Sequence, residues 1–273
     1  MNQALQFVVL LEAEEFKFKF QGIELAVRQK LRCPNRPTLV FLHDSLGCIQ
    51  LWRDFPDRLA ETVHCNFLIY DRFGYGRSDQ KAPLVERGID YLEVEAKVLN
   101  ELILQRNVKD PIYFGHSDGG SIALIAGALN PDLPLAIITE GAHIFVEEIT
   151  LAGIREVKQT YDTTDLKERL AKYHGEHTED VFHSWIRTWL RPEFRDWNIE
   201  QFLASIQCPV LAIQGIDDEF GSIEQVNGIV NQVSGQSNAY LVPDAKHTPH
   251  KEAQESTLER ASDFIHSLFN EYN

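Results

Sequence analysis

The sequence predicts an α/β protein in which a mostly parallel eight-stranded sheet carries helices on both faces and a helical cap. Two observations support this fold class. From residue 38 onward, short apolar runs alternate with helical stretches, and the alternation is interrupted once, over residues 144–205. Continuous apolar runs of strand length are typical of strands buried on both faces, as in a parallel sheet covered by helices.

The N-terminal segment offers three candidate strands, around residues 5–11, 15–20 and 23–28. The segment EFKFKF (15–20) alternates polar and apolar side chains, like a strand with one face in water. We expect this region to form an edge hairpin or meander. Six apolar runs bounded by turn residues predict the other strands: 38–44, 66–72, 111–117, 135–141, 209–215 and 239–244.

Helical stretches lie between these apolar runs. Segment 91–106 places Leu92, Ala96 and Leu99 on one face at helical spacing. Segment 119–129 has short apolar side chains and is expected to be a buried helix, and the amphipathic segment 251–269 is expected to close the fold.

The segment between residues 144 and 205 contains no strand-like run. Four amphipathic pieces predict helices there: 147–160, 164–173, 178–190 and 199–206. Aromatic residues are concentrated in this segment, and among them we choose Trp185 and Trp189 as candidates for substrate binding. Ligands of open α/β sheets bind at the carboxyl ends of the strands. We therefore expect a core of residues 1–143 and 206–273, with a helical cap (144–205) over that edge.

The composition is that of an ordinary globular protein. Of the 273 residues, 44% are hydrophobic and 25% are charged, and no apolar stretch reaches the ~18 residues of a membrane span. The formal net charge of −15 repels phosphate groups, so we expect neither nucleic acid nor a membrane as a partner. The composition leaves a homodimer open.

The N-terminus does not have the features of a secretion signal. MNQALQFVVLLEAEEF lacks a basic region and has acidic residues where a cleavage site would lie. The four cysteines form no C-x-x-C pair, and we expect them to be free thiols in a reducing compartment: Cys33, Cys48, Cys65 and Cys208. We therefore predict a cytoplasmic protein.

The motif with the strongest chemical content is Gly115-His116-Ser117-Asp118-Gly119. It fits G-x-S-x-G, with an apolar strand before it and a helix after it. In such a turn the serine lies on a sharp, strained bend, and side chains at the two glycine positions would collide with the neighbouring strand and helix. The motif predicts that Ser117 is a nucleophile raised above the sheet at the start of a helix, where positive helix charge favours an oxyanion.

A serine nucleophile needs a base, and in this arrangement the acid and then the histidine follow the serine along the chain. His247 comes just after the last predicted strand and is our predicted base; His250 is expected to cap the following helix. For the acid we rank Asp218 first, Asp217 second and Glu140 third. Two of the adjacent acids Asp217, Asp218 and Glu219 are expected to be solvated loop residues.

The oxyanion is expected to be bound by two backbone amides. One is the amide of Asp118, and the other should come from the loop after the first central strand, His43-Asp44-Ser45-Leu46-Gly47. We assign it to Ser45, with Leu46 as the alternative. The ring of His43 is expected to stiffen this loop through hydrogen bonds.

Five segments together resemble the α/β-hydrolase fold superfamily, and the similarity extends over essentially the whole chain. They are FLHDSLG (41–47), YDRFGYGRSD (70–79), GHSDGGSIAL (115–124), IQGIDDEFG (213–221) and PDAKHTPH (243–250). Within the α/β-hydrolase superfamily, the chain is similar to capped bacterial hydrolases and to the biphenyl-hydrolase-like (valacyclovir hydrolase) group. That group has a similar Ser-Asp-Gly-Gly sequence at the nucleophile turn. The resemblance implies Asp218 as the acid and His247 as the base.

Two positions depart from the family pattern. The usual His-Gly pair of the oxyanion loop is His43-Asp44 here, so a charge lies near the expected oxyanion unless the side chain points away. The usual glycine before the predicted catalytic histidine is replaced by Lys246 here.

The segment YDRFGYGRSD (70–79) contains two glycines, and Asp71 and Arg72 are expected to fix a tight loop there. No Walker lysine follows that would indicate a nucleotide site.

Asp118, directly after the nucleophile, raises the question of substrate choice. In the valacyclovir-hydrolase-like group such an aspartate is associated with amino-acid ester substrates, so we list Asp118 as a candidate for substrate binding. The alternative is that it only caps its helix.

We interpret the chain as a serine hydrolase that cleaves a small-molecule carboxylic ester through an acyl-enzyme, with Ser117, His247 and Asp218 as its triad. No cofactor and no metal is implied. Alternatives are a hydrolase of C–C bonds, lactones or amides, or a ligand-binding or signalling protein on the same fold.

Overall fold

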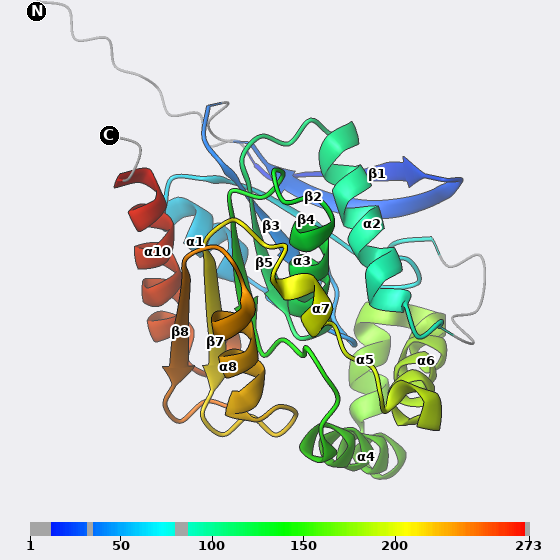
Figure 1. Ribbon diagram of the computed structural model, residues 1–273. Helices are drawn as coiled ribbons and strands as arrows, with labels where there is room; N and C mark the ends of the chain where they lie inside the picture. Colours follow the sequence, from blue (N-terminus) through cyan, green and yellow to red (C-terminus); the bar gives the residue numbers. More distant parts are fainter. Residues whose placement is uncertain (1–11, 32–34, 80–86, 271–273) are drawn as a thin grey trace, which may run out of the picture.

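One mixed sheet of eight strands organises the part of the chain that this computed structural model describes, residues 12–31, 35–79 and 87–270 (Figure 1). The strand order is β1-β2-β4-β3-β5-β6-β7-β8, antiparallel between β1, β2 and β4 and parallel from β4 to β8. The strands are β1 (Glu14–Phe20), β2 (Ile23–Lys30), β3 (Thr38–Leu42), β4 (Asn66–Tyr70), β5 (Pro111–His116), β6 (Ala136–Glu140), β7 (Val210–Gly215) and β8 (Ser237–Val242). This confirms the predicted fold class.

Helices cover both faces of the sheet, as the continuous apolar strands require. Helices α1 (Phe55–Thr62) and α10 (Gln254–Asn270) pack on one face. Helices α2 (Tyr91–Gln105), α3 (Asp118–Leu129) and α8 (Ile223–Gln232) pack on the other. In β3, Val40 and Leu42 lie in the core beneath the second group, whereas Leu39 and Phe41 lie in the core beneath the first.

A helical insertion (residues 144–205) separates β6 from β7. It contains α4 (Glu148–Thr163), α5 (Leu166–His174), α6 (Thr178–Leu190) and α7 (Glu200–Leu203), close to the four predicted pieces. In Figure 1, α4, α5 and α6 lie together beyond the carboxyl ends of the strands. The two ends of the insertion meet in one antiparallel bridge between Phe145 and Asn198. Its last helix, α7, packs instead against α3 and α8 of the core.

Several predictions of local structure need correction or cannot be compared. The expected closing helix at 251–269 is split into α9 (Pro249–Glu252) and α10, with Ala253 between them in a non-helical conformation (φ −134°, ψ 54°). The candidate strand at 5–11 and Cys33 lie outside the described residues. The other three cysteines are buried thiols that form no disulfide within the described part of the chain. No helix among the described residues is both long and apolar enough to span a bilayer.

Candidate active site

Ser117 occupies the sharp turn between β5 and α3 that the motif predicts. Its backbone has φ 54° and ψ −120°, a conformation that costs energy for any residue with a side chain. The flanking glycines make this turn sterically feasible. A Cβ at Gly115 would lie 2.1 Å from the carbonyl oxygen of Gly119, and a Cβ at Gly119 would lie 2.1 Å from that of Leu42.

His247 and Asp218 complete a hydrogen-bonded chain with Ser117. The loop after β8 carries His247, and its Nε2 lies 2.9 Å from Ser117 Oγ. Its Nδ1 lies 2.9 Å and 3.0 Å from the two carboxylate oxygens of Asp218, in the loop after β7. With Nδ1 protonated, the histidine donates to Asp218 and accepts from the Ser117 hydroxyl, which is the arrangement that a general base requires.

The charges around His247 and Asp218 shift the pKa values of both side chains. Burial lowers the pKa of His247, but the carboxylate of Asp218, helped by Glu219 and Asp44, outweighs burial and raises that pKa above its ordinary value. Burial raises the pKa of Asp218, but His247 and the amide of Phe220 outweigh it, so the carboxyl group stays ionised.

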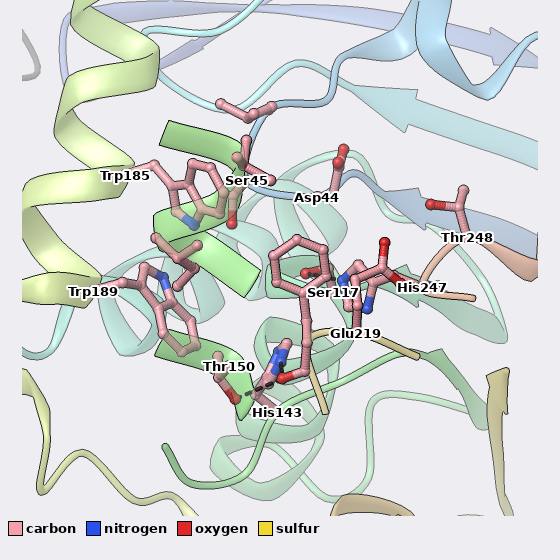
Figure 2. A pocket seen from close by; sticks show the side chains of 14 residues that line it. Asp44, Ser45, Ser117, His143, Thr150, Trp185, Trp189, Glu219, His247 and Thr248 are labelled. Atoms are coloured by element: carbon pink, nitrogen blue, oxygen red, sulfur yellow. Dashed lines mark hydrogen bonds between the residues drawn. The ribbon is translucent and has the colours of Figure 1, made fainter. Parts of the chain in front are cut away.

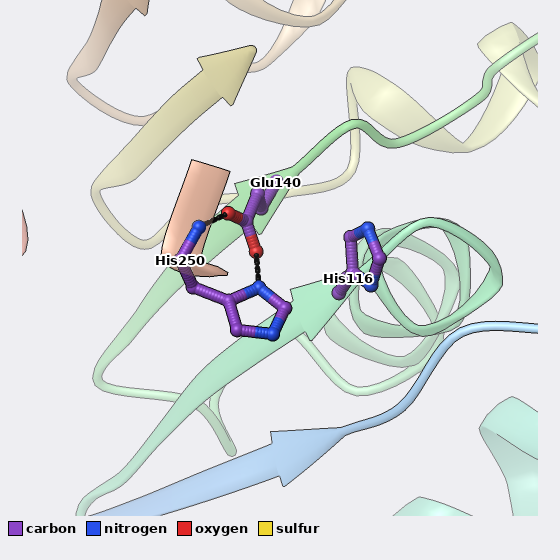
Figure 3. Close-up of side chains that lie close together, drawn as sticks. All are labelled: His116, Glu140 and His250. Carbon is purple, nitrogen blue, oxygen red and sulfur yellow. Dashed lines mark hydrogen bonds and ion pairs between the residues drawn. The ribbon is translucent and has the colours of Figure 1, made fainter. Parts of the chain in front are cut away.

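The structure separates the three acids that the sequence left open. Asp218 is the one bonded to His247, while the neighbouring Asp217 is exposed to solvent. Glu140 is buried and pairs with His250, accepting from its ring Nδ1 at 2.6 Å and from its backbone amide (Figure 3). His250 therefore does not act as the helix cap that we expected, because its ring is engaged by a core carboxylate.

His116 lies beside this pair, so that His116, Glu140 and His250 bring metal-ligand atoms within 4.8 Å of one another. Both carboxylate oxygens of Glu140 already accept hydrogen bonds, and His116 Nε2 bonds to the carbonyl oxygen of His247 at 2.9 Å. Burial lowers the pKa of His116 to about 4, so its ring is neutral. These contacts form a buried hydrogen-bonded network that supports the loop of His247.

Ser117 and His247 open into a cavity of about 160 Å³ between the core and the helical insertion (Figure 2). Helix α4 contributes Thr150, Ile154 and Val157, and α6 contributes both predicted tryptophans, Trp185 and Trp189. The carboxylates in its lining belong to Asp44 and Glu219, and the described lining contains no lysine or arginine.

The predicted oxyanion loop lies against the same cavity, through Asp44, Ser45 and Leu46. The amides of Ser45 and Asp118 donate no hydrogen bond to any described residue. The ring of His43 stiffens the loop as expected, because its Nδ1 bonds to the carbonyl oxygen of Asp44 at 2.8 Å and its Nε2 accepts from the amide of Arg72 at 3.0 Å.

The carboxylate of Asp44 folds back over its own loop, where a Cβ at Gly47 would lie 1.9 Å from Asp44 Oδ1. In Figure 2 it points away from Ser117. Burial raises its pKa, but His116, Lys251, His43 and His247 lower it to about 2, so it is ionised.

Asp118 does not lie where the substrate-binding prediction placed it, since its side chain is absent from the lining of the cavity. The carboxylate is buried at 1% exposure, where its Oδ2 accepts from the Tyr91 hydroxyl at 3.0 Å and pairs with Arg72 at 3.4 Å. Among the described residues no backbone amide of α3 donates to this carboxylate, so the expected helix cap is not formed, and its buried Oδ1 has no partner there. The reason is the buried guanidinium of Arg72, which a carboxylate at this position compensates.

The sequence model of a protein family described as "alpha/beta hydrolase fold" matches residues 37–200, which is more than half of the chain. The chain belongs to the alpha/beta hydrolase fold family. Its relatives support a hydrolase: it is 29% identical to the human serine hydrolase BPHL over 205 residues, which covers 72% of this chain and 68% of that protein. The resemblance inferred from the sequence is thereby confirmed.

Solved structures place this hydrolase among proteins of the same fold. A bacterial membrane phospholipase A superposes with a TM-score of 0.75 at 18% identity, covering 94% of this chain and 87% of that one. The esterase RhEst1 from Rhodococcus sp. ECU1013 has a TM-score of 0.69 at 20% identity, covering 94% of this chain and all 100% of that one. At these identities the likeness concerns the fold alone.

Sequence reasoning missed two polar residues of the hydrolase cavity. Glu219, which we expected to be a solvated loop acid, lines the cavity and accepts from the amide of His247 at 3.3 Å. His143 also lines it; its Nε2 bonds to the carbonyl oxygen of Phe220 at 3.0 Å, and its ring centre lies 5.7 Å from that of His247. Glu219 could have been found from its place beside Asp218, but His143 follows no motif.

Proposed function

We propose that this protein is a serine hydrolase that cleaves a small-molecule carboxylic ester with Ser117, His247 and Asp218. The observation that carries the proposal is the chain of hydrogen bonds from Ser117 Oγ through the ring of His247 to Asp218, each 2.9 Å long. A serine hydroxyl is a weak nucleophile by itself, and this arrangement supplies the base that activates it.

The reaction proceeds in two halves. His247 takes the hydroxyl proton while Ser117 Oγ attacks the acyl carbon, and it then returns that proton to the departing alcohol, leaving an acyl-enzyme. Water next attacks the acyl carbon while His247 takes one of its protons. The resulting tetrahedral intermediate collapses, His247 returns the proton to Ser117 Oγ, and the carboxylic acid is released. Asp218 holds the tautomer of His247 and stabilises its charged form throughout.

The amides of Ser45 and Asp118 would bind the oxyanion in both halves. Both amides lack an acceptor among the described residues, and Asp118 is the first residue of α3, where the helix end carries partial positive charge. Such preorganised donors stabilise charge that develops only in the transition state.

The helical insertion would act as a cap that shapes the acyl pocket and excludes water. Trp185, Ile154 and Val157 supply apolar surface, and the carboxylates of Asp44 and Glu219 supply the charge of the lining. This combination favours a neutral ester, or one that carries an ammonium group, over an ester with a second anionic group.

The test is the intact mass of the protein after treatment with a fluorophosphonate probe, comparing wild type with Ser117→Ala. We expect one adduct on the wild type and none on the variant, followed by turnover on a panel of esters. Absence of an adduct on folded wild type would overturn the proposal. An adduct accompanied by a single burst and negligible steady-state turnover would favour the ligand-binding alternative.

A further inference from the structure

We propose that Arg72 and the side chain of Asp118 are positioning residues that join the two halves of the oxyanion hole. The inference rests on the proposed function, because it takes the amides of Ser45 and Asp118 as the oxyanion donors. Asp118 carries one of these amides in its own backbone. Through its carboxylate it holds Arg72, and Arg72 binds the peptide that carries the other amide.

The contact of Arg72 with the oxyanion loop acts on a single peptide group. Arg72 Nη2 donates to the carbonyl oxygen of Asp44 at 2.8 Å. This carbonyl and the amide of Ser45 belong to the same planar peptide, in which N–H and C=O point in opposite directions when the bond is trans. The chain has no cis peptide bond among its described residues. A guanidinium on the carbonyl side therefore fixes the plane of the peptide and directs the Ser45 amide to the opposite side.

The same contact also makes the amide a better donor. A carbonyl that accepts hydrogen bonds polarises its peptide group and strengthens the N–H on the other side. The carbonyl oxygen of Asp44 accepts from Arg72 and lies 2.8 Å from His43 Nδ1. Arg72 also donates its backbone amide to the ring of His43 at 3.0 Å, so it holds the loop at two points.

The carboxylate of Asp118 keeps the guanidinium in this place. The side chains of Arg72 and Asp118 are 0% and 1% exposed, and their closest charged atoms lie 3.4 Å apart. A buried guanidinium without a counter-charge is strongly disfavoured. Burial lowers the pKa of Arg72, but Tyr75 and Asp118 outweigh it and raise that pKa, so the group stays charged.

The Arg72–Asp118 pair, together with the Asp44 carbonyl that Arg72 binds, forms a bridge between the two oxyanion amides. Hydrogen bonds extend this bridge into the helical insertion. Tyr91 donates its hydroxyl to Asp118 Oδ2 at 3.0 Å and accepts from Trp189 Nε1 at 2.9 Å. Trp189 lines the cavity from α6. The other oxygen of Asp118, Oδ1, is buried and has no partner among the described residues. A substrate ammonium group on Oδ1 is therefore the alternative that an experiment must separate from positioning.

The experiment compares Asp118→Asn, Arg72→Gln and the double variant with wild type on two p-nitrophenyl esters, acetate and L-alaninate. We expect kcat to fall about tenfold to a hundredfold on both esters, with KM changed less than about threefold, because the lost interaction acts in the transition state. The affinity for a phenylboronic acid, which forms a tetrahedral adduct on the serine, should fall by the same factor as kcat/KM.

The double variant guards against misfolding, because it leaves neither an unpaired carboxylate nor an unpaired guanidinium in the core. If the two side chains act as one bridge, its loss of kcat should be no larger than the greater of the two single losses. The matched control is Asp57→Asn, which breaks the ion pair with Arg28 (2.8 Å) outside the cavity and should leave kcat unchanged.

Two results would overturn the inference while leaving the proposed function intact. One is a kcat within twofold of wild type in folded Asp118→Asn and in the double variant. The other is a rise of KM for the alaninate ester alone, which would make Asp118 a substrate contact. Wild type that neither turns over esters nor reacts with the fluorophosphonate would overturn the proposed function itself, and this inference with it.

Discussion

Glu140 accepts two hydrogen bonds from His250, one from its ring and one from its backbone amide, in a core where both side chains are almost fully buried. The pair lies behind the loop of His247, to which His116 adds a hydrogen bond at 2.9 Å. The acid that ends β6 thus stabilises the histidine loop without touching the predicted triad.

This arrangement makes Glu140 a stability residue. Glu140→Leu leaves two buried donors of His250 unsatisfied, and we expect it to lower the free energy of unfolding by about 2–4 kcal/mol. Asp217→Ala, at the exposed neighbour of Asp218, should change it by less than about 0.5 kcal/mol. Urea denaturation followed by circular dichroism gives both values. Equal effects of the two substitutions would contradict the assignment.

The acid of the triad can be tested by a matched pair of substitutions. Asp218→Asn retains the shape of the side chain but favours the wrong tautomer of His247, so kcat should fall by about 10³–10⁴. Asp217→Asn should change kcat less than twofold, because that carboxylate is exposed and is not bonded to His247. Steady-state kinetics on p-nitrophenyl acetate distinguishes them, and a comparable loss in both variants would speak against Asp218.

The pH dependence follows from the direction of the pKa shift of His247. The base works only when neutral, so kcat/KM should rise with pH through the pKa of His247 and level off above it. Because that pKa is raised, the midpoint should lie above the ordinary histidine value of 6.5. The Glu219 carboxylate contributes to the increase, so Glu219→Gln should move the midpoint to lower pH.

A pH–rate profile with an uncharged ester measures this shift. Glu224→Gln is the control, because this exposed residue is not part of the described lining of the cavity. An unchanged midpoint in Glu219→Gln, or an equal shift in the control, would show that Glu219 does not act on His247.

The acyl pocket should respond to a change in Trp185. Trp185→Ala enlarges the cavity, so the ratio of kcat/KM for octanoate to that for acetate should rise at least about tenfold, since each buried methylene contributes about 0.8 kcal/mol. Trp52→Phe, in the core on the opposite face of the sheet, should leave this ratio unchanged. The assay is a series of p-nitrophenyl esters of increasing chain length. A ratio unaffected by Trp185→Ala would remove this residue from the acyl pocket.

The sequence alone determined the strands from residue 15 onward, the turn at Ser117 and the chain order of serine, acid and histidine. These features depend on interactions that are local or strictly periodic. The bend at Ser117 needs small residues two positions away on each side, and a strand buried on both faces needs a continuous apolar run. Such requirements are visible in the order of the residues.

Only the tertiary structure decided which charged groups meet. The sequence could not choose among Asp217, Asp218 and Glu140, because all three lie at strand ends on the same edge of the sheet. In the folded chain, the loop after β7 brings Asp218 to His247, whereas Glu140 at the end of β6 pairs with His250. The partner of the Asp118 carboxylate could not be foreseen for the same reason, since Arg72 lies 46 residues away in the chain. Charge pairing in a folded core depends on distance in space, which the local pattern of a sequence does not specify.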